Sequence, residues 1–132
     1  MATMQVELVS AERRLWSGEA EMVVARTTEG EIGVLPGHAP MLGELGEGVL
    51  RVIQAGGTEV SAAIHGGFLS VSATGVSVLA DIAELGTDID LTRAQAAYDR
   101  AVASISGSDD AAALEALNRA KARLRAAGQP VA

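Results

Sequence analysis

The stretch from Thr28 to Pro40 constrains this chain more than any other part of it. Its sequence, TEGEIGVLPGHAP, places three glycines and two prolines among four apolar residues, two carboxylates and one histidine. Glycine permits positive φ angles and proline fixes φ, so this composition is typical of a stiff, shaped loop between strands. Because stiff exposed loops often carry function, we expect this one to contact a partner.

Short strands are predicted from Met4 to about Asp81. Val6 and Leu8 alternate with polar neighbours, and glycine-containing turns at 54–57 and 73–75 separate later apolar runs. Regular turns between many short strands predict a β-sandwich or flattened barrel of about ten strands. The chain has one Trp, one Phe and one Tyr, so we expect an aliphatic core and no base-stacking surface for single-stranded nucleic acid.

Two helices are predicted after residue 86. Asp90 is placed to cap the first, in which apolar residues recur at spacings of three and four: Leu91, Ala94, Tyr98, Val102 and Ile105. The residues 106–108, Ser-Gly-Ser, are predicted to break this helix. A second helix is predicted to start near Asp109 and to end before Gly128, with three leucines on one side: Leu114, Leu117 and Leu124.

The expected fold class is therefore mainly β plus α. We predict an N-terminal β-sandwich over residues 1–86 and a C-terminal antiparallel two-helix hairpin over residues 87–132. Both helices are short and alanine-rich, and such helices are marginal without a partner. We therefore expect the hairpin to be the less stable part, able either to dock or to move.

The formal net charge of −7 argues against a nucleic-acid partner. The charge is uneven, since residues 1–110 carry six basic and sixteen acidic side chains, whereas residues 111–132 carry four basic and one acidic. Two interpretations of the basic second helix stay open: a solvated helix whose cations favour its own dipole, or a helix that docks on an acidic surface.

The residue types needed for several kinds of chemistry are missing. The chain has no cysteine, and nothing near its two histidines, His38 and His65, supplies further ligands at metal spacing. It also lacks a G-x-S-x-G elbow and a G-x-x-x-x-G-K-[ST] loop. We therefore expect no enzyme, no metal site and no required cofactor. We also expect no membrane span and no secretory signal.

The run T-x-G-E-[IL]-G-[IV]-x-P-x-H-x-P resembles the signature of the epsilon subunit of the F-type ATP synthase. The resemblance continues in Trp16-Ser-Gly18, in Gly66-Gly-Phe-Leu69 and in Val78-Leu-Ala-Asp81. It implies a non-catalytic subunit of the central stalk, which couples ion-driven rotation of the c ring to ATP synthesis. The partners implied are the gamma subunit, the c-subunit ring and the alpha/beta catalytic head. The implied location is peripheral, on the cytoplasmic face of the bacterial cell membrane, with membrane contact only through the complex.

In epsilon subunits the signature loop rests on the c ring. The resemblance therefore assigns this contact to Glu31, Pro36, His38, Met41 and Leu42. Without the resemblance, Glu31 and His38 are equally well interpreted as solvated loop residues. The family also implies that the hairpin either folds against the sandwich or extends into the catalytic head, where it inhibits ATP hydrolysis.

The segment Ile89-Asp-Leu-Thr-Arg-Ala94 resembles the I-D-x-x-R-A pattern with which some bacterial epsilon subunits bind ATP. The resemblance implies ATP as a regulatory ligand, held by eight residues: Glu84, Ile89, Asp90, Arg93, Ala94, Arg100, Arg119 and Arg123. Arginine suits phosphate oxygens, and carboxylates accept hydrogen bonds from an amino group or a ribose.

A structural interpretation of the same residues stays open. Asp90 is a good helix cap with or without ATP, and Arg93 and Arg100 lie opposite the apolar face of their helix. If the two apolar stripes meet between the helices, the arginines of the two helices point away from each other. Two further identities also stay open: a free-standing β-sandwich module that binds nucleotide, and the mitochondrial delta subunit, which shares the architecture.

Overall fold

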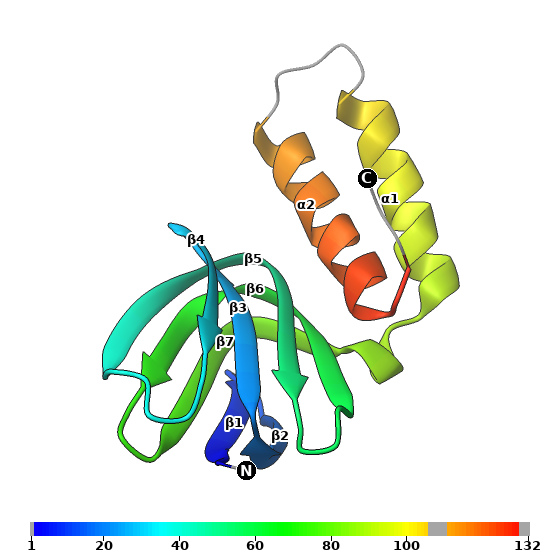
Figure 1. The fold of residues 1–132 in the computed structure, drawn as a ribbon. Coiled ribbons are helices and arrows are strands. Elements are labelled where there is room, and N and C mark those ends of the chain that lie inside the picture. The colour runs from blue at the N-terminus through cyan, green and yellow to red at the C-terminus, as the bar shows by residue number, and fades with distance from the viewer. Residues whose placement is uncertain (1, 106–110, 130–132) are drawn as a thin grey trace.

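The computed structural model of the chain describes residues 2–105 and 111–129. The described part contains seven strands, one short 3-10 helix and two α-helices (Figure 1). In chain order they are β1 (Met4–Ser10), β2 (Arg14–Ala20), β3 (Met22–Thr27), β4 (Gly30–Val34), β5 (Met41–Ile53), β6 (Glu59–Val71), β7 (Gly75–Leu85), η1 (Gly86–Asp88), α1 (Leu91–Ile105) and α2 (Ala111–Ala126).

The strands pair in the order β2-β1-β7-β6-β5-β3-β4. Strand β1 runs parallel to β7, and the other neighbours are antiparallel. Figure 1 shows that the long strands curve strongly, so that the sheet folds over itself, while the helical hairpin lies beyond one end of it. The predicted order of a β domain followed by two helices is confirmed.

The prediction of about ten strands is wrong for the described residues, because the long strands bend without breaking. Strands β5 and β6 have 13 residues each. Gly66 and Gly67 have φ angles of 81° and 122°, which L side chains rarely adopt. The β6–β7 ladder pairs His65 with Ile82 and Gly67 with Ala80, with no pair recorded between them. Two glycines thus let one strand serve both layers of the folded sheet.

An aliphatic core fills the folded sheet. Alternation along β1 buries Met4, Val6 and Leu8, as the sequence predicted for the last two. Phe68 takes no part in this core, since it is 49% exposed. Valine, leucine and alanine therefore supply the buried surface, and Trp16 packs only at its margin.

The predicted helix ends within the described residues are confirmed. The Asp90 Oδ1 atom accepts a hydrogen bond from the Arg93 N–H at 3.1 Å, which caps α1. At the end of α2, Gly128 has a φ of 88° and the Gln129 N–H donates to the Leu124 carbonyl at 2.8 Å. The predicted break at 106–108 and the predicted start at Asp109 lie outside the described residues.

Small residues supply most of the buried positions of the two helices, and Leu124 is the one large side chain among them. Helix α1 packs against α2 and buries Ala94 and Ala101. Leu91, Val102 and Leu114 are exposed by 41%, 43% and 53%. The buried residues of α2 lie in its C-terminal half, where Ala122, Leu124 and Ala126 belong to a cluster shared with the sheet. The alternative in which two large apolar stripes meet between the helices does not fit these exposures.

The sheet and α2 share a second, smaller core. It consists of Ala63 on β6, Ile89 and Ala94 near the start of α1, and three residues of α2: Ala122, Leu124 and Ala126. Tyr98 packs against it from α1. This cluster holds the hairpin on the sheet. No helix in the described residues has the length and apolar content needed to cross a membrane.

Candidate nucleotide groove and loop surface

A groove of about 560 Å³ lies where the end of β7, η1, α1 and α2 meet. It is lined by seven of the eight residues predicted to hold ATP: Glu84, Ile89, Asp90, Arg93, Ala94, Arg100 and Arg123. Ile82, Asp88 and Ala97 complete its walls. Segments as distant in sequence as Glu84 and Arg123 thus contribute to one site.

The eighth predicted residue, Arg119, lines an adjoining groove of about 550 Å³ between α1 and α2. Arg100 and Arg123 line both grooves. The four arginines therefore line two neighbouring grooves that share Arg100 and Arg123. The alternative in which meeting apolar stripes direct the arginines of the two helices apart does not fit this arrangement, since Arg100 of α1 and Arg123 of α2 line the same groove.

Two of the groove residues form its buried floor. Ile89 is 9% exposed and Ala94 is 4% exposed, and both belong to the cluster that joins the sheet to α2. Asp90 lies at the N-terminus of α1, and one of its carboxylate oxygens accepts the capping hydrogen bond. These residues set the position of α1 and so of Arg93, which lies in the first turn of the helix.

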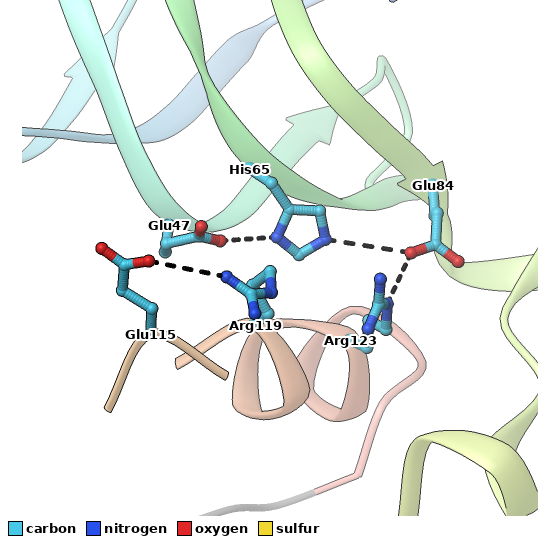
Figure 2. Close-up of polar contacts among 6 residues, drawn as sticks. All are labelled: Glu47, His65, Glu84, Glu115, Arg119 and Arg123. Atoms are coloured by element: carbon cyan, nitrogen blue, oxygen red, sulfur yellow. Dashed lines mark hydrogen bonds and ion pairs between the residues drawn. The ribbon is translucent and has the colours of Figure 1, made fainter. Parts of the chain in front are cut away.

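Glu84 links the sheet to the hairpin. Its Oε1 atom accepts a hydrogen bond from Arg123 Nε at 2.6 Å. Figure 2 shows this pair together with a buried histidine, His65, whose Nδ1 donates to Glu47 Oε2 at 2.5 Å. The sequence did not predict this role of His65, for which neither a metal site nor an active site was expected. Its signal was the alternation on β6, which places His65 on the same side as Ala63.

Only three of the five residues predicted to contact a c ring line the same groove. Glu31, Met41 and Leu42 line a shallow groove of about 430 Å³ beside β4 and β5. Pro36 and His38 lie in the loop between those strands, outside this groove. The loop is held by its own backbone, since the His38 N–H donates to the Leu35 carbonyl at 3.1 Å and Gly37 has a φ of 86°.

Exposed apolar side chains accompany this loop. Leu42 is 71% exposed and Leu35, which the sequence did not indicate as a contact residue, is 56% exposed. Large exposed aliphatic groups beside a stiff loop are typical of a surface that another chain covers. Leu35 is therefore a further exposed apolar residue in the same loop as Pro36 and His38.

A wider groove of about 840 Å³ separates the other side of α2 from β5 and β6. Its charges are mixed: Arg26, Arg51, Lys121 and Arg125 face it together with Glu31, Glu47 and Glu59. The hydrogen bond from Arg51 to Glu59 raises the pKa of Arg51 above its ordinary range. Among the described residues, no group of three or more His, Cys, Asp or Glu side chains has an arrangement able to hold a metal ion.

A family model described as "ATP synthase, Delta/Epsilon chain, beta-sandwich domain" matches residues 3–86. The chain belongs to the ATP synthase delta/epsilon family. Among similar curated proteins, the ATP synthase epsilon chain of Rhodococcus jostii is 54% identical over 127 residues, which cover 96% of this chain and 97% of the relative. The epsilon chain of Streptomyces avermitilis is 50% identical over 125 residues, covering 95% of each.

Solved structures agree with this assignment. A chain of the Euglena gracilis mitochondrial ATP synthase (OSCP, F1 and c-ring) matches with a TM-score of 0.79 and 30% identity, covering 96% of this chain and 82% of that one. A chain of the Tetrahymena thermophila mitochondrial ATP synthase central stalk and c-ring, at 18% identity and a TM-score of 0.54 over 94% of this chain and 92% of that one, shares the fold.

The resemblance that the Thr28–Pro40 loop indicated is confirmed, and so is the β-sandwich class of the N-terminal part. The chain is an epsilon subunit of an ATP synthase, a component of the central stalk of the F1 sector. ATP synthesis and ion transport are activities of that complex as a whole.

Proposed function

We propose that this epsilon subunit transmits c-ring rotation through the central stalk and that its hairpin regulates ATP hydrolysis by the assembled enzyme. The partners in this proposal are the gamma subunit, the c ring and the alpha/beta head, and its location is the cytoplasmic face of a bacterial membrane. Support comes from the family and from the full-length similarity to bacterial epsilon chains. Chemistry takes place in other subunits, and this chain has a mechanical and regulatory role.

We propose further that ATP binds in the groove between the sheet and the hairpin. The observation that carries this proposal is the convergence of Glu84, Arg93, Arg100 and Arg123 on one hollow of about 560 Å³. Arginine forks bind phosphate oxygens by paired, charge-assisted hydrogen bonds. Carboxylates, which only accept hydrogen bonds when ionised, suit the adenine amino group and the ribose hydroxyls.

The groove supports regulation because its walls come from both parts of the molecule. Glu84 belongs to the sheet, whereas Arg93, Arg100 and Arg123 belong to the hairpin. A ligand that contacts both parts binds the docked arrangement more tightly than an extended one. It therefore shifts the hairpin toward the docked state by the difference between the two affinities. In this proposal ATP holds the hairpin on the sheet and so relieves inhibition.

The c-ring contact is proposed for the loop surface at Glu31, Pro36, His38, Met41 and Leu42. Support comes from the exposure of Leu42 and Leu35 and from the rigid backbone between β4 and β5. The apolar groups supply buried area in this contact. Glu31 and His38 supply polar contacts that set its registration.

Calorimetric titration of the isolated chain with ATP tests the groove. Saturable binding by the wild type that is lost in both Arg93→Ala and Arg123→Ala is the expected result, because both side chains line the same hollow. Arg13→Ala, which removes an arginine from the turn between β1 and β2, is the matched control and retains binding. Absence of heat at millimolar ATP would contradict the nucleotide site while leaving the stalk assignment intact.

A further inference from the structure

The groove proposed to hold ATP has two unlike sides. Its cations come from the helices, Arg93 and Arg100 from α1 and Arg123 from α2. Strand β7 supplies Ile82 and Glu84, which are two residues apart and therefore lie on the same side of the strand. A ligand in this groove thus meets guanidinium groups on the helices, and an aliphatic side chain with a carboxylate on the sheet.

Ile82 differs from the other apolar residues that line the groove. Ile89 is only 9% exposed, because it belongs to the cluster between the sheet and α2. Ile82 is 56% exposed and belongs to neither core cluster of the described residues. A single apolar side chain on an open surface is ordinary, but this one lies among charged groups in a concave site. It therefore provides apolar surface that a bound ligand can cover.

The three arginines differ in whether their charges are already paired. Arg123 donates from Nε to Glu84 Oε1 at 2.6 Å, and this pair joins α2 to β7 (Figure 2). Among the described residues, the side chains of Arg93 and Arg100 form neither an ion pair nor a hydrogen bond. Because their guanidinium groups are free to bind phosphate oxygens, the phosphates of a nucleotide are expected on the α1 side.

The groove also has room for a base. Ala97 lies four residues after Arg93 and three residues before Arg100, so these three residues share one face of α1. All three line the groove, and the middle one has the smallest side chain. The volume of about 560 Å³ lies within the range of pockets that hold small organic ligands, roughly 300–1,000 Å³.

The chemistry of a nucleotide matches these two sides. Its phosphates are anionic, whereas its base is a planar ring with apolar faces and a polar edge. Proteins that bind a single base pack apolar or aromatic side chains against the faces of the ring and hydrogen-bond its edge. Ile82 is suited to the first role. The Glu84 carboxylate, which has a second oxygen beside the one paired with Arg123, is suited to the second.

We propose that the base of the bound nucleotide packs against Ile82 while its phosphates contact Arg93 and Arg100. The inference rests on the proposed nucleotide site and deepens it, because Ile82 is not among the eight residues that the family resemblance assigns to ATP. In this arrangement Ile82 favours a nucleotide over inorganic phosphate or polyphosphate, which carry the same kind of charge but no base.

Nuclear magnetic resonance of the full chain with ATP tests the contact directly. The chain has six isoleucines, so selective labelling of their δ1 methyl groups gives a simple spectrum. Ile82→Leu identifies the Ile82 signal, because that signal is missing from the variant. We expect a nuclear Overhauser effect between the Ile82 methyl group and the adenine ring protons at saturating ATP. Absence of this effect at saturation would overturn the proposal.

Calorimetric titration measures how much the contact contributes to affinity. Ile82→Thr keeps a β-branched side chain on the strand but removes apolar surface, so it is expected to weaken ATP binding about three- to tenfold. Leu79→Thr is the matched control, since Leu79 lies on the same strand, is 50% exposed and does not line the groove. It is expected to change the affinity by less than about twofold. Unchanged affinity in Ile82→Thr would also overturn the proposal.

Arg93→Ala separates this inference from the proposed function. If the wild type binds ATP and Arg93→Ala loses binding while Ile82→Thr binds as tightly as the wild type, the nucleotide site stands and the contact with Ile82 is wrong. If the wild-type chain shows no saturable binding of ATP, both the inference and the proposed nucleotide site fail.

Discussion

At the scale of single residues, Gly67 carries the bend that lets β6 serve two layers. Its φ angle is 122°, and a Cβ atom there would stand 2.2 Å from the Leu79 carbonyl oxygen. Gly67→Ala is therefore expected to lower the free energy of unfolding by about 3 kcal/mol or more, since backbone strain and a steric clash add. Urea unfolding followed by circular dichroism measures the change.

Gly56 is the matched control for that prediction. Its φ angle is 86°, but a Cβ atom there meets nothing within 4 Å. Gly56→Ala is therefore expected to cost only about 1–2 kcal/mol, the cost of the backbone conformation alone. Equal effects of the two substitutions would show that the close approach of β6 to β7 does not determine the bend.

Asp90 gives a second prediction at this scale. Its carboxylate caps α1 through the Arg93 N–H. Asp90→Ala is expected to destabilise the first turn of α1 by about 1 kcal/mol, seen as faster amide hydrogen exchange there. Asp99→Ala, which removes only an exposed hydrogen bond from Gln95, should leave that turn unchanged. Unaltered exchange in Asp90→Ala would contradict the capping role.

Sequence alone predicts Asp90 but not His65, and the reason is physical. A helix cap is a local arrangement, in which the accepting side chain lies three residues from its donor. The partners of His65 are Glu47 and Glu84, which are 18 and 19 residues away and become neighbours only through the register of β5, β6 and β7. No spacing in the chain encodes that contact.

At the scale of elements, the helices α1 and α2 show how well the spacing of apolar residues in the sequence predicts which residues are buried. The sequence located both helices and the end of α2, because caps and turn residues are local. Its apolar stripes match the buried residues only in part: Ala94 and Leu124 are buried, whereas Leu91, Val102 and Leu114 are exposed, because alanines carry little weight in a hydrophobic pattern although they supply most of the buried helix positions. The family resemblance identified Arg93, Arg100, Arg119 and Arg123 as a set. The helical periodicity did not predict that arginines from both helices line the same groove.

The leucines of α2 provide the corresponding prediction. Leu124 is 2% exposed against the sheet, whereas Leu114 is 53% exposed. Leu124→Ala is expected to destabilise the docked hairpin by about 2–5 kcal/mol, because it leaves a cavity in the shared cluster. Leu114→Ala is expected to change stability by less than about 0.5 kcal/mol. Hydrogen exchange of α2 measures both.

The predicted leucine stripe would give a different result. If Leu114 and Leu124 both lay between the helices, both substitutions would destabilise the hairpin to a similar extent. Similar protection losses in the two variants would therefore contradict the packing described for α2.

At the scale of the whole molecule, the acidic sheet domain and the basic α2 form one docked unit. The contact includes the cluster around Ala63 and Leu124 and the pair between Glu84 and Arg123. The sheet has its own separate core, so release of this contact would not require the sheet to unfold. This division of the molecule is compatible with the hairpin movement that the proposed function requires.

The architecture at this scale was the most predictable part of the chain. Turn residues and strand alternation located the sheet, and the loop from Thr28 to Pro40 identified the family. The bending of the long strands was less predictable. Gly66 and Gly67 lie inside the continuous strand β6, whereas the sequence pattern predicts two shorter strands there.

The most direct test of the regulatory role is the rate of ATP hydrolysis by the assembled ATP synthase with and without residues 111–132 of this chain. The deletion removes α2, with Arg119 and Arg123, and leaves the sheet core intact. Equal amounts of gamma subunit in the two preparations show that assembly is unaffected. The account predicts faster hydrolysis by the truncated complex, and an unchanged rate would contradict the hairpin as a brake.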